Sequence, residues 1–328
     1  MKRRSFITLL GGAAATWPVA ARAQQSPLPV LGFLNAATPD TFPDRMRAYR
    51  QGLSQAGFDD GRNVVIEYRW ANNYNERLPA LAADLVRRKV AVIAAVGGAP
   101  AVLAAKAATT DIPIVFQIGI DPIELKIVSS LARPSGNLTG VSSLNSDVTA
   151  KRLELMHEVV PAATKMALLV NPANPAGTDI MMREAGKAAR TLNVDLQVLR
   201  ASSEREIETA FSTLVQEGAR GVVIAQDAFF TGRNEQLAAL ALQHKLPTVS
   251  PYREFPAAGG LMSYGGDITE SWRLAGMYAG RVLKGEKPAD LPVEQSTKVE
   301  LVISMKTAKA LGMTLPITLL GRADEVIE

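Results

Sequence analysis

Short apolar runs alternate with longer amphipathic segments along most of the chain, in two successive series. Runs of this length are typical of buried strands, and the segments between them repeat apolar positions with the period of a helix. Alternating strands and helices predict parallel sheets that are covered by helices on both faces. The predicted strands lie at residues 30–34, 64–66, 90–96 and 112–118, then at residues 166–170, 194–199, 221–225 and 246–249. The sequence therefore predicts an α/β protein with two doubly wound parallel-sheet lobes.

Three segments interrupt this alternation and are candidate crossings between the lobes. Residues 136–143 are rich in Gly, Ser and Thr, residues 251–255 follow the last strand of the second series, and residues 284–288 break a long helical pattern. Three crossings would build each lobe from two separate parts of the chain. The expected lobes are residues 24–141 with 252–287, and residues 142–251 with 288–328.

The first 23 residues have the features of a cleaved export signal. Basic residues 2–4 precede an apolar run at residues 6–15 and the small-x-small sequence Ala21-Arg22-Ala23, which is the required order. The apolar run is shorter than the roughly 20 residues that cross a membrane as a helix. The pair Arg3-Arg4 resembles the twin-arginine type of bacterial signal. We expect cleavage after Ala23 and export to the periplasm.

Removal of the leader changes the charge of the protein. The whole chain has a formal charge of +4, and the leader carries four basic residues and no acid, so the mature chain is close to neutral. Nucleic acids and anionic membranes are bound through basic patches on the folded domain. The basic character of the full sequence therefore gives no support for either partner.

The residues that usually carry catalysis or bind metals are scarce. The chain has no cysteine and two histidines, His157 and His244, so zinc sites of the Cys/His kind cannot form. His157-Glu158 begins like the zinc-protease helix motif, but Pro161 replaces its second histidine. The nucleophile elbow, the phosphate loop and the dinucleotide fingerprint are all absent from the sequence. We expect no catalytic residue, no metal and no cofactor.

Polar residues at the carboxyl ends of the predicted strands are candidate ligand contacts, because open α/β sheets bind ligands at that edge. Asn35 and Asn171 occupy the same place in two similar segments, residues 33–39 and 169–175. We predict that both residues orient a ligand, together with Gln117. The alternative is that Asn and Pro only make a turn and start a helix.

Charged ligand groups have candidate partners at three further strand ends. Gly97, Gly98 and Ala99 follow a strand and begin a helix, where free backbone N–H groups would bind a carboxylate. A plain strand-to-helix turn explains them equally well. Asp121 or Asp227 would bind a positive group.

Some candidates have an alternative that needs no ligand. Asp121 precedes Pro122 and suits a helix cap as well as a binding site. Asp267 has the same ambiguity, since it begins a capping-box pattern. The aromatic residues Phe42, Tyr252 and Tyr264 fall in or beside predicted loops, where a ring would cover an apolar ligand or simply pack in the core.

Several motifs resemble one known family. Residues 130–142 read Ser-Leu-Ala-Arg-Pro-Ser-Gly-Asn-Leu-Thr-Gly-Val-Ser, and further similarity lies at residues 151–155, 171–175, 259–264 and 301–303. These segments resemble the ABC transporter substrate-binding proteins of the tryptophan/tyrosine-type family over nearly all of the mature chain. Lys126 and Ser135 depart from the glycines of the family pattern. The resemblance implies a type I periplasmic binding protein, in which three crossings join two lobes around one ligand. These motifs do not determine the ligand, and we expect an aromatic or other amino acid or a related carboxylate.

We therefore predict a monomer that captures a small-molecule solute and delivers it to an ABC permease with its ATPase. It would contact the membrane only through the permease. Two alternatives stay open, a sensing module that docks on a receptor and an exported α/β enzyme. We do not expect a DNA-binding regulator of the same architecture, because the segment between Ala23 and Val30 leaves no room for a recognition helix.

Replacement of Arg3 and Arg4 by Lys tests the export route. Because the twin-arginine route reads the arginine pair, the double variant should keep its leader and stay in the cytoplasm. Immunoblots of periplasmic and cytoplasmic fractions measure this. Normal processing of the variant would show that the general secretion route suffices.

Overall fold

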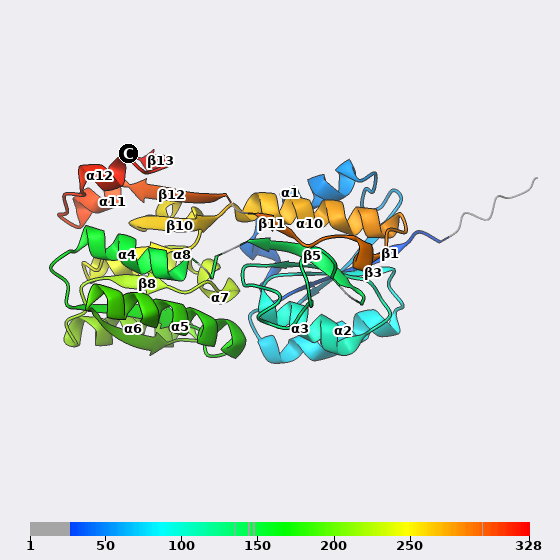
Figure 1. Cartoon of the computed structure of the whole chain (residues 1–328), viewed down its shortest axis with the longest axis horizontal. Coiled ribbons are helices and arrows are strands. Elements are labelled where there is room, and N and C mark those ends of the chain that lie inside the picture. The colour runs from blue at the N-terminus through cyan, green and yellow to red at the C-terminus, as the bar shows by residue number, and fades with distance from the viewer. Residues whose placement is uncertain (1–26, 135, 144, 147, 297) are drawn as a thin grey trace, which may run out of the picture.

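The computed structural model describes residues 27–134, 136–143, 145–146, 148–296 and 298–328, so the predicted leader lies outside the described residues. Two lobes lie side by side along the long axis of the molecule (Figure 1). Each lobe has one sheet with a buried apolar cluster on either face. All strand pairs are parallel except β10–β12. The predicted α/β architecture of two parallel-sheet lobes is confirmed.

The sheet of the first lobe has the strand order β11-β5-β4-β3-β1-β2. Its strands are β1 (Val30–Asn35), β2 (Val65–Trp70), β3 (Val92–Val96), β4 (Ile114–Ile118), β5 (Leu138–Ser143) and β11 (Glu294–Ser296). Its helices are α1 (Pro43–Gln55), α2 (Leu78–Arg87), α3 (Ala99–Ala108) and α10 (Ile268–Leu283), with short 3-10 turns η1 (Pro39–Thr41), η2 (Asn75–Arg77) and η3 (Pro288–Asp290).

The sheet of the second lobe has the strand order β13-β12-β10-β9-β8-β6-β7. Its strands are β6 (Lys165–Val170), β7 (Asp195–Arg200), β8 (Val222–Ile224), β9 (Thr248–Ser250), β10 (Met262–Gly266), β12 (Val299–Ser304) and β13 (Glu325–Ile327). Its helices are α4 (Thr149–Val159), α5 (Pro175–Leu192), α6 (Glu204–Gln216), α7 (Ala228–Thr231), α8 (Asn234–Gln243), α9 (Glu254–Ala257), α11 (Met305–Ala310) and α12 (Ile317–Leu320).

The segment at residues 136–143, predicted as a crossing from its small residues, forms strand β5 over most of its length. Gly140 explains this composition, because a Cβ there would lie 2.1 Å from the backbone oxygen of Phe116 on β4. The small residues therefore reflect close packing between neighbouring strands, and the first crossing begins after Ser143.

The structure also corrects the predicted lobe boundaries. Strand β10 pairs with β9 and β12 in the second sheet, so residues 252–266 do not belong to the first lobe as predicted. Strand β11 pairs with β5, which places residues 288–296 in the first lobe instead of the second. The boundaries were misplaced because a break in the hydrophobic pattern marks the end of an element and does not show which sheet the next strand joins.

Helices α1 and α10 pack against each other on one face of the first sheet, although more than 200 residues separate them in the chain. A Cβ on Gly52 would lie 1.8 Å from the backbone oxygen of Arg273, and a Cβ on Gly276 would lie 2.0 Å from that of Tyr49. The two backbones thus approach at glycines. The contact carries Trp272 into the core beside Phe33, with 6.1 Å between the ring centroids.

Arg152 on α4 joins the first crossing to strand β10. Its side chain is fully buried, and Nε donates to the backbone oxygen of Tyr264 at 2.7 Å while Nη2 donates to that of Asn145. The Asn145 side chain in turn accepts a hydrogen bond from the N–H of Gly266 at 2.8 Å. Burial lowers the pKa of Arg152 to about 10, which leaves the guanidinium charged at neutral pH. One buried cation and Asn145 therefore hold the first crossing against strand β10.

Among the described residues, we find no helix with the length and apolar character needed to cross a membrane.

Replacement of Gly276 by Ala tests the close packing of α1 and α10. The added methyl would collide with the backbone of α1, so we expect the free energy of unfolding to fall by roughly 1–3 kcal/mol, measured by urea denaturation. Gly186→Ala on α5 is the matched control, because the nearest heavy atom to a Cβ there lies 3.8 Å away. That control should be neutral or slightly stabilising. Equal stability of the two variants would contradict the argument.

Candidate ligand-binding cleft

A cleft lies between the lobes, where the carboxyl ends of the strands in both sheets face each other. The space free of protein atoms there, the open margin of the cleft included, is about 650 Å³. Residues after β1, β3 and β4 line it from the first lobe, and residues after β6, β8 and β9 line it from the second. This is the edge at which the sequence analysis predicted a ligand.

The start of helix α3 faces the cleft as predicted, and Gly97, Gly98 and Ala99 are among its lining residues. Gly97 and Gly98 have φ angles of 141° and 99°, which favour glycine. Gly98 caps the helix, and the first backbone N–H groups of a helix lack partners within it. Because the helix dipole adds a partial positive charge, this end of the cleft suits a carboxylate.

Asn35 lies behind the cleft lining instead of in it. Its side chain is fully buried, donates to the backbone oxygen of Val96 and accepts from the N–H of Ala37 at 2.8 Å. A Cβ on Gly97 would lie 2.7 Å from the Asn35 amide. Asn35 therefore joins the ends of β1 and β3 and occupies the space that a side chain at residue 97 would need.

Asp227, just past β8, is held by a pair of asparagines in the second lobe. Its two carboxylate oxygens accept from Asn171 Nδ2 at 2.8 Å and from Asn174 Nδ2 at 3.0 Å, and one also accepts from the N–H of Phe229 at 2.9 Å. Asp227 and both asparagines line the cleft. Burial raises the pKa of Asp227, and these hydrogen bonds oppose the rise. Among the described residues no cation pairs with this carboxylate.

An aromatic wall covers one side of the cleft. Phe42 and Trp272, both from the first lobe, meet edge to face with 5.7 Å between their ring centroids, and Tyr252 from the second lobe lines the same cavity. Burial raises the pKa of Tyr252 to about 12, so its hydroxyl stays neutral at physiological pH. The structure thus brings Phe42 and Tyr252 together as predicted and adds Trp272.

Arg45, which the sequence analysis missed, connects the lobes beside this wall. Its guanidinium lies 4.4 Å from the ring centroid of Phe42 and 4.6 Å from that of Tyr252, and Nη2 is 2.8 Å from Glu254 Oε1. Burial acts to raise the pKa of Glu254, but the charge of Arg45 and the hydrogen bonds to the carboxylate together outweigh it, so the pKa is lowered. Helix α1 of the first lobe is therefore tied to α9 of the second by a stacked ion pair.

Besides Asn35, three of the predicted site residues lie outside the cleft lining, and Gln117 lies within it. The Asp121 carboxylate accepts from the N–H of Ile123 at 2.7 Å, and that of Asp267 accepts from the N–H of Glu270 at 3.0 Å. Asp267 therefore caps helix α10, whereas Asp121 caps only a turn, because no helix begins at Pro122. Tyr264 packs against the apolar core of the second lobe. Gln117 is buried, with Nε2 at 3.5 Å from Ser143 Oγ.

Trp272, Arg45 and Asn174 were missed for different reasons. Trp272 and Arg45 belong to helices, and the helical pattern shows only that a position faces inward. It does not distinguish a position that faces the core from one that faces a cleft. Asn174 did leave a signal, because it precedes Pro175 at a helix start and belongs to the segment that carries Asn171. Within the described residues, no cluster of three or more His, Asp or Glu side chains is placed to hold a metal ion.

Comparison with known proteins agrees with this geometry. The model of the ABC transporter substrate binding protein family matches residues 40–327. A tyrosine-binding protein of Clostridioides difficile strain R20291 is 29% identical over 268 residues, which is 81% of this chain and 76% of that protein.

Two solved structures share the fold of the chain. An ABC domain from Streptococcus pneumonia in complex with L-Trp has a TM-score of 0.82 at 24% identity, over 92% of this chain and all of that one. A ligand-free, open substrate binding protein from Clostridium difficile has a TM-score of 0.63 at 22% identity, over 92% of this chain and 99% of that one. With the family match covering nearly the whole described chain, this protein belongs to the ABC transporter substrate binding protein family.

Proposed function

We propose that the protein binds an amino acid with an aromatic side chain in the cleft between its lobes. The observation that carries this proposal is the Asp227 carboxylate, which lies in the cleft with amide and N–H partners and no cation among the described residues. A ligand ammonium group would supply the missing positive charge. The tyrosine-binding relative and the L-Trp complex support an amino acid as the class of ligand.

The cleft offers a partner for each part of such a ligand. The ammonium group would lie at Asp227, the carboxylate at the N–H groups after Gly98, and the aromatic ring beside Phe42 and Trp272. Asp227 belongs to the second lobe, and the other three residues belong to the first. A ligand that contacts both lobes binds the closed arrangement more tightly and stabilises it.

We further propose that the protein works as the periplasmic component of an ABC importer. It would be exported by the leader that ends at Ala23, act as a monomer, and hand its ligand to a permease with an associated ATPase. The family match and the binding roles of the named relatives support a carrier instead of an enzyme.

Replacement of Asp227 by Asn tests the ammonium site. Asparagine keeps the size but not the charge, so the Kd for L-tyrosine and L-tryptophan, measured by calorimetry, should rise at least tenfold. Asp121→Ala is the control, because Asp121 caps its own turn outside the cleft, and it should leave the Kd unchanged. Unchanged affinity in Asp227→Asn, or a loss in Asp121→Ala, would contradict this assignment.

The pH dependence of binding gives a second test of Asp227. Only the ionised carboxylate attracts an ammonium group, so affinity should fall as the pH is lowered through the pKa of Asp227. Burial raises this pKa, and the loss should therefore begin at a higher pH than the ordinary value of about 3.9 would give. The acid-side loss should disappear from the Kd profile of Asp227→Asn. A profile that is the same in both proteins would assign the titration to another group.

Disruption of the Arg45–Glu254 pair tests whether it supports the closed arrangement. Arg45→Met removes the link between the lobes and leaves Glu254 without its cation, so we expect a higher Kd through faster ligand dissociation in stopped-flow measurements. Arg281→Met is the control, because Arg281 pairs with Glu286 on the surface of the first lobe. Equal dissociation rates in both variants would show that the pair does not act on closure.

A further inference from the structure

The side chain of Gln226 reaches from the second lobe to the backbone of the first. Gln226 directly precedes Asp227 and lines the cleft. A Cβ on Gly119, which follows β4 in the first lobe, would lie 2.0 Å from Gln226 Nε2 and 2.4 Å from its Oε1. The amide therefore occupies the space that any side chain at residue 119 would fill, and this contact joins the two lobes.

The side-chain oxygen of Gln226 is an acceptor that lacks a hydrogen-bond donor. Gln226 Oε1 is buried and has no hydrogen-bond partner. Across the cleft in the first lobe, Asn73 Oδ1 is also buried without a partner. Because a buried acceptor without a donor destabilises the structure, these two oxygens indicate a molecule that donates hydrogen bonds to both lobes.

The number of candidate acceptors in the cleft matches the number of donors on a primary ammonium group. A primary ammonium has three N–H donors. The cleft provides the Asp227 carboxylate and the amide oxygens of Gln226 and Asn73 as acceptors. Arg45 adds no competing positive charge, because Glu254 pairs with it.

We infer that Gln226 is a specificity-determining residue, which accepts a hydrogen bond from the primary ammonium group of the ligand, and that Gly119 is required to admit it. This inference rests on the proposed function and deepens it. It assigns the cleft to primary α-amines in preference to their N-methylated forms, since each added methyl group removes one donor.

Calorimetry on the mature protein with L-tyrosine and N-methyl-L-tyrosine tests the inference. The wild type should bind L-tyrosine at least tenfold more tightly than the methylated form. Gln226→Met keeps the length of the side chain against Gly119 but removes the acceptor. This variant should bind L-tyrosine at least fivefold more weakly and discriminate less between the two ligands. A residue that only fills space would leave both quantities unchanged.

The role of Gly119 is tested by a double-mutant cycle. Gly119→Ala should displace the amide and weaken L-tyrosine binding by a factor similar to that of Gln226→Ala. The double variant should bind no more weakly than Gln226→Ala alone, because the amide is lost in both. Losses that multiply in the double variant, or full affinity in Gly119→Ala, would overturn this role.

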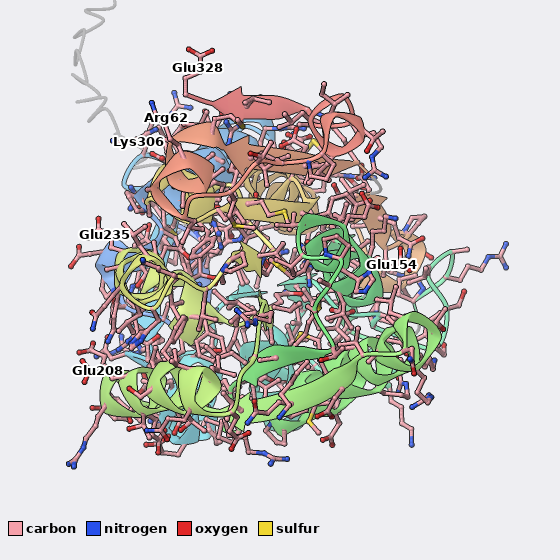
Figure 2. All side chains as sticks on the ribbon, turned by 90° about the vertical axis from the view of Figure 1, so that its left-hand side faces the viewer. Arg62, Glu154, Glu208, Glu235, Lys306 and Glu328 are labelled. Carbon is pink, nitrogen blue, oxygen red and sulfur yellow. The ribbon has the colours of Figure 1, made fainter. Side chains whose placement is uncertain are left out.

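Lobe closure can be followed separately, because the chain has no cysteine of its own. Spin labels at Arg47→Cys on α1 and Glu235→Cys on α8 report the distance between the lobes. Both native side chains are exposed, and Glu235 projects outward at the edge of the second lobe (Figure 2). At a saturating ligand concentration for the wild type, Gly119→Ala should not reach the closed distance, and the double variant with Gln226→Ala should reach it. Full closure in Gly119→Ala would overturn the steric argument.

The outcomes separate this inference from the proposed function. If the wild type binds L-tyrosine and Asp227→Asn loses binding while Gln226→Met keeps it, the inference is wrong and the proposed function stands. If the wild type binds neither tyrosine nor tryptophan, the proposed ligand class is wrong and the inference is lost with it.

Discussion

The buried charge of Arg152 is the interaction on which the arrangement of the two lobes depends. A guanidinium removed from water costs several kcal/mol unless its donors are satisfied, and here the partners include backbone oxygens from the first crossing and from strand β10. The first crossing must therefore keep its path beside β10 for the arginine to remain buried. Asn145 extends the cluster, because its Nδ2 donates to Ser143 Oγ at 3.1 Å, and Gln117 of the cleft lies within reach of the same hydroxyl. The joint between the lobes and the floor of the cleft thus belong to one polar network.

The cleft is electrostatically asymmetric, and the proposed ligand class rests on this asymmetry. Its one lining arginine, Arg45, is neutralised by Glu254, whereas Asp227 in the lining has no such partner among the described residues. The first lobe contributes a helix start, the second contributes the carboxylate, and each lobe contributes two aromatic residues. An amino acid that lies across the cleft would therefore use both lobes at once.

The sequence predicted the strand-end part of the site and missed the helical part. In parallel sheets the carboxyl ends of the strands share one edge. The positions of Gly98, Gln117 and Asp227 at strand ends could therefore be predicted from the order of strands and helices along the chain. Helical residues such as Arg45 and Trp272 need the packing of α1 against α10, which no local pattern encodes. Conversely, Asp121 and Asp267 satisfy N–H groups two or three residues away, and this local use is indistinguishable in sequence from a ligand contact. The predicted lobe boundaries were wrong because the hydrophobic pattern of a strand does not show which other strands it pairs with.

The position of α10 has a consequence for how the chain acquires its fold. The first lobe begins at β1, but its core is incomplete without Trp272 and its neighbours on α10, which begins at residue 268 of 328. During synthesis the second lobe, except for β12, α11, α12 and β13, emerges before that helix is available. Such non-local pairing slows folding and leaves apolar surface uncovered while the ribosome is still at work. The first lobe is therefore translated first but cannot complete its core first. The two lobes complete their folding nearly together.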